Sequence, residues 1–187
     1  MANSLPHEPS GIALSVIQAL VLYSLVEHQL GHAKSIRVTA NEHAFSVADD
    51  GRGHAVNRTV EGAPYLNFIY SQLDYPFEAG EGKSIQIQGI GMSLLNRLCS
   101  VLSVSVRKPE ATLNMNFENG TLVHHEFLAL GSSSTGTEIS ARIDTRFERQ
   151  AVNPEVLRHW LLGVLAASPS LRLSFNGQVL VLPSWPA

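Results

Sequence analysis

The spacing of apolar residues predicts a buried helix followed by two strands. Residues 11–30 are apolar on most sides of a helix, which we expect to end near Gly31. Residues 35–40 and 44–49 alternate between apolar and polar side chains with a period of two, and Asn-Glu-His forms the turn between them. This part of the chain therefore predicts a helix and a β-hairpin.

Three further segments have helical features. Residues 61–73 predict a helix whose first turn must contain Pro64. The sequence Gly-Ile-Gly opens the next helix, in which five residues have helical spacing: Met92, Leu95, Leu98, Cys99 and Leu102. Asn153 and Pro154 are typical of the N-cap and first residue of an amphipathic helix, which runs to about Ala167.

The remaining signals indicate hairpins and one long loop. Asn-Gly pairs at 119–120 and 176–177 are each flanked by alternating residues, the pattern of a β-hairpin. Residues 74–89 hold three glycines and a proline and predict a long surface loop. The sequence thus predicts an α+β fold, a two-layer sandwich with a mixed, mostly antiparallel sheet covered on one face by helices. We expect a single domain over 1–187, with residues 1–10 as a flexible N-terminus.

Composition narrows the function classes. The chain has 187 residues, of which 44% are hydrophobic, enough for the core of one domain. Its formal net charge of −3 gives no cationic surface for a phosphate backbone, so we expect no direct nucleic-acid binding. Residues 12–26 fall short of a membrane span, and no basic signal-peptide region precedes them. Cys99 is the only cysteine, which fits a reducing compartment, and we expect a cytoplasmic protein with no membrane contact.

Two glycine-containing motifs could hold a ligand. Asp-Asp-Gly-Arg-Gly at 49–53 follows the second strand, where such a sequence alone is more often a tight turn. Gly-Ile-Gly at 89–91 opens a helix, and backbone N–H groups and the helix dipole favour an anion there. Each motif alone is weak evidence for a ligand site, but the two together favour a nucleotide site.

The order of these features resembles the ATP-binding domain of the GHKL superfamily, and most closely that of the B subunit of DNA gyrase and of related type II topoisomerases. The resemblance extends from about Gly11 to Leu182. Its most specific parts are residues 49–53, 61–62, 89–99 and 135–137, and the late helix followed by Ser-Leu-Arg-Leu-Ser-Phe.

The resemblance implies an adenine site around the first motif. Asp49 would accept a hydrogen bond from the exocyclic amine of adenine. Gly51 and Gly53 would let the base lie against the backbone, with Arg52 along one side of the pocket. Thr137 would reach the same edge of the base, directly or through water.

The resemblance also implies a phosphate site around the second motif. Gly89, Ile90 and Gly91 would present backbone N–H groups to the phosphates. Lys83 would add a further phosphate contact, and the loop 74–89 would act as a lid over ATP or ADP.

Each of these residues also has a structural interpretation, which the sequence leaves open. Asp49 could cap a turn, and Arg52 could form a surface ion pair. Thr137 is a favoured strand residue, and Lys83 could be a solvated loop charge. For the neighbouring Asp50 we expect a role in holding the turn.

The chain departs from the family on its first helix. Gyrase-type members carry a glutamate there that activates water and, four residues later, an asparagine that holds Mg²⁺. In the ungapped register Ala19 and Tyr23 stand at these positions, so no catalytic residue and no metal ligand is predicted. The same register places Glu27 to pair with Arg52. A shift by one residue would bring Gln18 and Leu22 to the two positions instead.

These departures favour a nucleotide-binding module over an enzyme. The chain also ends short of the second domain that supplies a lysine in gyrase-type enzymes. We expect binding of ATP or ADP with weak or absent hydrolysis, doubtful Mg²⁺ binding, and a regulatory role with a protein partner or as a homodimer. One alternative is a competent ATPase of a topoisomerase-like assembly whose base comes from elsewhere. The other is an interaction domain that has lost the nucleotide.

Overall fold

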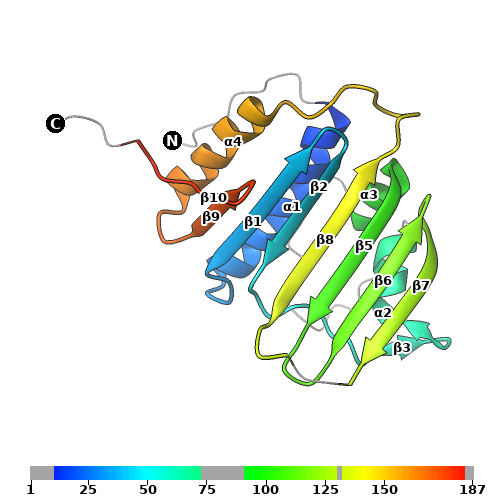
Figure 1. Cartoon of the computed structure of the whole chain (residues 1–187). Helices are drawn as coiled ribbons and strands as arrows, with labels where there is room; N and C mark the ends of the chain where they lie inside the picture. Colours follow the sequence, from blue (N-terminus) through cyan, green and yellow to red (C-terminus); the bar gives the residue numbers. More distant parts are fainter. Residues whose placement is uncertain (1–10, 73–90, 130–131, 184–187) are drawn as a thin grey trace.

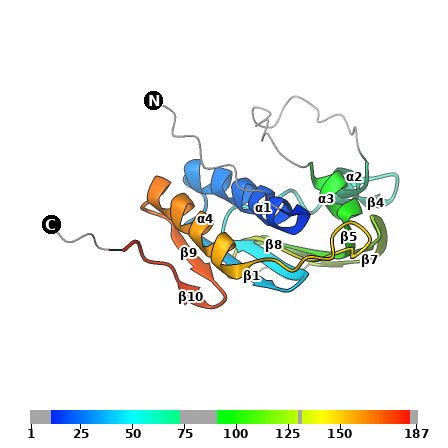
Figure 2. The ribbon, with the colours of Figure 1, turned by 90° about the horizontal axis from the view of Figure 1, so that it is seen from above.

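A computed structural model describes residues 11–72, 91–129 and 132–183, so the expected flexible N-terminus 1–10 lies outside the described residues. Among these residues, an eight-stranded sheet has helices on one face only (Figures 1 and 2). The strand order is β10-β9-β1-β2-β8-β5-β6-β7, and β1 and β9 are parallel while the other neighbours are antiparallel. The predicted sandwich with a mixed sheet is therefore confirmed.

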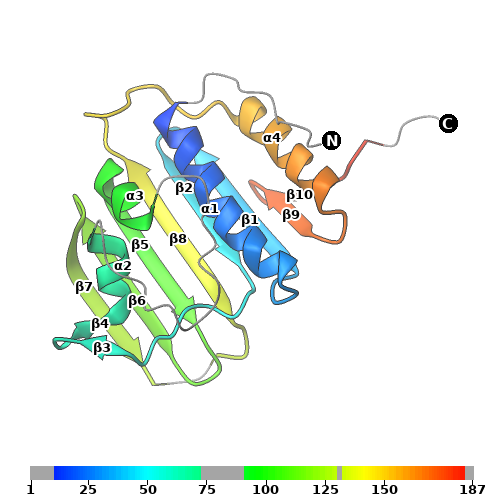
Figure 3. The ribbon, with the colours of Figure 1, turned by 180° about the vertical axis from the view of Figure 1, so that it is seen from behind.

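The strands of this sheet are β1 Ser35–Asn41, β2 Ala44–Asp49, β5 Cys99–Arg107, β6 Thr112–Glu118, β7 Thr121–Leu128, β8 Gly136–Ile143, β9 Arg172–Phe175 and β10 Gln178–Val179. A separate short hairpin consists of β3 Thr59–Val60 and β4 Ala63–Pro64. The helices are α1 Ile12–Gln29, α2 Tyr65–Ser71, α3 Met92–Leu98 and α4 Pro154–Ala167. In Figure 3, α1 and α4 lie over one part of the sheet and α2 and α3 over the other.

Alternation of side chains explains why the sheet has one covered and one open face. In β6, Leu113, Met115 and Phe117 are buried toward the helices, whereas Asn114 and Asn116 point to the opposite side. We call that opposite side, which no described helix covers, the open face. The core therefore lies between the sheet and the helices.

Helix α1 is the central element of that core. The sequence indicated that residues 12–26 fall short of a membrane span, but the whole helix of 18 residues is long and apolar enough to cross one by length and composition. In this structure the helix packs on β1 and β2. Seven of its residues are buried: Ala13, Val16, Ile17, Ala19, Leu20, Val21 and Ser24. Gly31 follows the helix with φ +80°, a left-handed conformation that suits glycine, as predicted.

The helix expected over residues 61–73 begins later than predicted. Glu61 and Gly62 have φ +50° and +80° and form the turn of the β3–β4 hairpin, so they cannot start a helix. Pro64 is the N-cap of α2 and lies before its first turn. The expectation that Pro64 lies within that turn is therefore wrong.

The helix that follows Gly-Ile-Gly is shorter than its apolar spacing indicated. It ends at Leu98, and Cys99 and Leu102 belong to β5. Hydrogen bonding of β5 to both β6 and β8 outweighs the helical spacing, and the pairing shifts register between Cys99 and Val101. Cys99 is buried, and this burial raises the pKa of its thiol to about 12.

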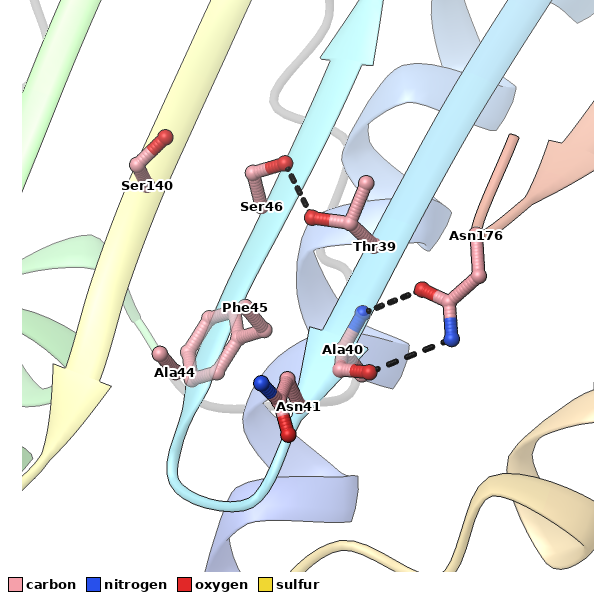
Figure 4. Close-up of a pocket in the computed structure, with 8 residues that line it drawn as sticks. All are labelled: Thr39, Ala40, Asn41, Ala44, Phe45, Ser46, Ser140 and Asn176. Carbon is pink, nitrogen blue, oxygen red and sulfur yellow. Dashed lines mark hydrogen bonds between the residues drawn. The ribbon is translucent and has the colours of Figure 1, made fainter.

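The predicted hairpin turns and the cap of α4 are confirmed. Asn119 and Asn176, each followed by glycine, have positive φ. The side chain of Asn176 also accepts from Ala40 N–H at 2.9 Å and donates to Ala40 C=O at 3.2 Å (Figure 4). At α4, the Asn153 side chain accepts from two backbone N–H groups of the first turn.

Candidate functional site

Three elements meet at the carboxylate of Asp49, the last residue of β2. Its Oδ1 accepts from Gly51 N–H at 2.9 Å and from Thr137 N–H, on β8, at 3.3 Å. Its Oδ2 accepts from the hydroxyl of Ser24, on α1, at 2.8 Å. The structure therefore brings together Asp49, Gly51 and Thr137, which the resemblance assigned to one site.

The two oxygens of this carboxylate differ in how many further hydrogen bonds they can accept. Each carboxylate oxygen can accept about two hydrogen bonds. Within the described residues, Oδ1 already has two donors, whereas Oδ2 has only the Ser24 hydroxyl. One further donor could therefore bind at Oδ2, although the Asp49 residue is only 6% exposed.

Ser24 is the residue that sequence reasoning missed. It is buried on the side of α1 that faces Asp49. A polar residue within an otherwise apolar segment was the available signal. Its partner became visible only once the packing of α1 against β2 was known.

The glycines of the site make room for the protein's own atoms. A Cβ at Gly51 would lie 3.0 Å from both Asp49 Oδ1 and Glu27 Oε2. Gly53 has φ +66°, and a Cβ there would lie 2.8 Å from a valine methyl of β5. At Gly136, with φ +132°, a Cβ would lie 2.0 Å from the Asp49 carbonyl oxygen. These glycines thus allow the close packing that holds Asp49, and contact of Gly51 and Gly53 with a base stays a prediction.

The predicted pair between Glu27 and Arg52 is present. Arg52 Nη2 lies 2.8 Å from Glu27 Oε1, and Arg52 Nε and backbone N–H donate to Oε2 at 3.2 Å and 3.1 Å. The Arg52 side-chain hydrogen bond holds the pKa of Glu27 below its ordinary value, against the opposing effect of burial. The pair anchors the loop 49–53 to α1.

This pair also orients one face of α1. Ala19, Tyr23 and Glu27 are four residues apart and lie along the same face of the helix. Since Glu27 contacts the loop, Ala19 and Tyr23 continue that face toward the helix N-terminus. Ala19 is buried, and burial raises the pKa of the half-buried Tyr23, so its phenol stays protonated at neutral pH.

Neither Ala19 nor Tyr23 has a side chain that could act as the base or the Mg²⁺ ligand of a hydrolytic centre. A methyl group has no base, and a protonated phenol is a poor ligand for Mg²⁺, which prefers carboxylate, amide and phosphate oxygens. Across residues 11–72, 91–129 and 132–183, no group of three or more His, Cys, Asp or Glu side chains could hold a metal ion.

Asp50 holds the turn, as expected from the sequence. One oxygen accepts from the backbone N–H groups of Lys34 and Ser35 at 2.7 Å and 2.8 Å, and the other from the Ser35 hydroxyl at 2.9 Å. These hydrogen bonds join the start of β1 to the end of β2. They also lower the pKa of Asp50, against the effect of burial.

At the expected phosphate site, only Gly91 of the motif Gly-Ile-Gly lies within the described residues. Gly91 is the exposed N-cap of α3, and a Cβ there would contact nothing within 4 Å. Lys83, Gly89, Ile90 and the loop 74–89 lie outside the described residues, so their phosphate contacts stay predictions.

Helix α3 is anchored by a second residue that the sequence did not single out. Asn96 is fully buried, and its Nδ2 donates to the backbone carbonyl oxygens of Tyr70 at 2.8 Å and Gly120 at 3.3 Å. This amide joins α3 to α2 and to the turn between β6 and β7. In the described part of the chain its Oδ1 has no partner.

Two hollows border the open face, and Asp49 lines neither of them. One, of about 280 Å³, lies beside the β1–β2 hairpin (Figure 4) and is lined by Thr39, Ala40, Asn41, Ala44, Phe45, Ser46, Ser140 and Asn176. The other, of about 440 Å³, is lined by Ser103, Val104, Ser105, Asn114, Asn116, His124, Glu126, Glu138 and Ser140. Neither includes a residue of the motif 49–53.

Known proteins are similar to most of this chain. No family model matches the chain. The B subunit of DNA topoisomerase 4 from Escherichia coli is 28% identical over 176 residues, which cover 87% of this chain and 27% of that protein. The Pseudomonas aeruginosa protein of the same name is 27% identical over 173 residues, covering 85% of this chain and 27% of that protein.

A solved structure agrees with these relatives. The topoisomerase IV ATP-binding domain of Francisella tularensis, in complex with a small-molecule inhibitor, has a TM-score of 0.72 and 23% identity. The match covers 87% of this chain and 80% of that one. The chain has a GHKL fold of the gyrase B type.

The chain spans 27% of the length of the Escherichia coli relative, so the likeness concerns one region of that protein. In this GHKL fold the residues assigned to the adenine edge lie together at the end of β2. That Ala19 and Tyr23 stand at the gyrase-type glutamate and asparagine positions stays a prediction.

Proposed function

We propose that this chain binds the adenine base of ATP or ADP at Asp49 and hydrolyses the nucleotide slowly or not at all. The observation that carries the proposal is the Asp49 carboxylate, which three donors hold in place and whose Oδ2 accepts from one donor among the described residues. In this role the domain is a regulatory or partner-binding module. A cytoplasmic location is part of the proposal and is supported by the single, buried Cys99.

The chemistry of Oδ2 favours adenine over guanine. Adenine presents an amine donor at the position where guanine presents a carbonyl oxygen. A carboxylate attracts the donor and repels the carbonyl. The similarity to a topoisomerase IV ATP-binding domain supports the same ligand class.

The first helix supports binding without efficient turnover. Loss of a general base typically lowers a rate by about 10²- to 10⁴-fold. Ala19 supplies no base, and the protonated phenol of Tyr23 does not fit Mg²⁺. We therefore propose that nucleotide binding needs no divalent cation.

Calorimetric titration with ATP, ADP and a nonhydrolysable ATP analogue, with and without Mg²⁺, tests this proposal together with a phosphate-release assay. We expect binding of all three ligands, little change on adding Mg²⁺, and phosphate release near the uncatalysed rate. Rapid phosphate release would support a competent ATPase instead. Absence of heat with every nucleotide would support an interaction domain without a nucleotide.

A further inference from the structure

The open face of the sheet carries two straight rows of outward side chains. The first row is Thr39, Ser46, Ser140, Ser103, Asn116 and His124, in register from β1 to β7. The second row is Arg37, Ala48, Glu138, Ser105, Asn114 and Glu126. Most of these side chains are short and uncharged, so a second flat surface could approach them closely.

Charge is divided between the two ends of these rows. Outward positions of β1 and β9 include Arg37 and Arg172 and no carboxylate, whereas those of β6 and β7 include Glu118 and Glu126 and no lysine or arginine. Arg37 and Glu126 stand at opposite ends of one row. Among the described residues neither of them forms an ion pair.

A two-fold axis parallel to the central strands would make this face self-complementary. Rotation by 180° about such an axis places each row of one copy over the same row of the other copy. The β1 end of the row then faces the β7 end of the partner's row. Arg37 then lies opposite the partner's Glu126, and Glu126 opposite the partner's Arg37. We propose that two copies of this chain associate through their open faces in this arrangement.

Shape supports the same arrangement. The hollow of about 440 Å³ lies on the acidic half and is bordered by Glu126. The facing half of a second copy would present the long side chain of Arg37 to this hollow. Twisted sheets stack with their strands within about 30° of each other, which keeps the two sets of rows roughly aligned.

The size of the face suits a stable dimer. Six strands spaced about 4.8 Å apart and about 23 Å long present roughly 650 Å² of projected area. A standard protein interface buries about 800 Å² on each partner. The short Ser, Thr and Asn side chains of the rows would hydrogen-bond across this interface, directly or through trapped water.

Sedimentation velocity of the full chain without nucleotide tests the interface. We expect a dimer for the wild type, and dissociation constants at least about tenfold higher for Arg37→Glu and for Glu126→Arg, because each change creates two like-charge contacts. An equimolar mixture of the two variants should recover the dimer, since both contacts then pair opposite charges. Arg158→Glu, on the exposed side of α4, is the matched control and should leave the dimer unchanged.

Three results would overturn this interface. The first is a wild type that stays monomeric at the highest attainable concentration. The second is a dimer that neither charge reversal weakens, which would point to another surface. The third is a mixture of the two variants that remains monomeric although circular dichroism shows both to be folded.

Discussion

At the scale of single residues, Asp49 is held by more of the structure than its place in a loop motif indicates. Its backbone carbonyl packs against Gly136, and its carboxylate is fixed from α1, from its own loop and from β8. Substitutions around Asp49 can therefore be chosen to change the stability of the fold or to change ligand binding.

Gly136→Ala should destabilise the protein strongly. The new Cβ would lie 2.0 Å from the Asp49 carbonyl oxygen at φ +132°, so strain and overlap together should cost about 3 kcal/mol or more of unfolding free energy. Gly177→Ala is the control, because φ there is +80° with open space around it, and it should cost about 1 kcal/mol. Urea unfolding measures both free energies. Equal losses in the two variants would contradict the close approach of Gly136 to the Asp49 carbonyl oxygen.

The Glu27–Arg52 pair should contribute a small, pH-dependent stabilisation. Because the folded-state pKa of Glu27 is lowered, this contribution is present above its unfolded pKa and is lost as pH falls through the folded pKa. Arg52 is 55% exposed, so solvent screening limits the contribution to under about 1 kcal/mol. The unfolding free energies of wild type and Glu27→Gln should differ at pH 7 and converge as the pH falls through the folded-state pKa of Glu27, which lies below its ordinary value. A difference that grows toward low pH would contradict this sign.

At the scale of elements, local signals predicted those parts of the fold that local chemistry determines. The cap Asn153, the Asn-Gly turns and the alternation of β1 and β2 have local causes and are confirmed. The end of α3 and the start of α2 were misjudged, because pairing of β5 with two neighbours and the β3–β4 hairpin involve contacts that spacing alone does not encode.

The cap of α4 gives a test at this scale. Asn153→Ala removes the acceptor of the Glu155 and Val156 backbone N–H groups and should lower the unfolding free energy by about 1 kcal/mol. Arg158→Ala, exposed in the middle of the same helix, should stay within about 0.5 kcal/mol of the wild type. Thermal unfolding compares the two, and an unchanged midpoint for Asn153→Ala would contradict the cap.

At the scale of the whole molecule, the resemblance predicted the architecture and which residues gather at Asp49, but not the details that set their chemistry. Ser24 as a partner of Asp49 and the rows of the open face depend on how α1 and the strands pack. The Glu27–Arg52 pair supports the register that puts Ala19 and Tyr23 on the face of α1 that meets the loop. Our proposal of slow or absent turnover depends on this register.

The most direct test of this account is the affinity of wild type and Asp49→Asn for ATP and GTP by calorimetry, with Glu126→Gln on the open face as control. An asparagine would turn its oxygen toward the N–H groups of Gly51 and Thr137, which leaves an NH₂ donor where the adenine amine would bind. We predict a wild type that prefers ATP over GTP, and a folded Asp49→Asn variant whose affinity for ATP is lower by about 10- to 100-fold. Unchanged ATP affinity in folded Asp49→Asn would contradict the account.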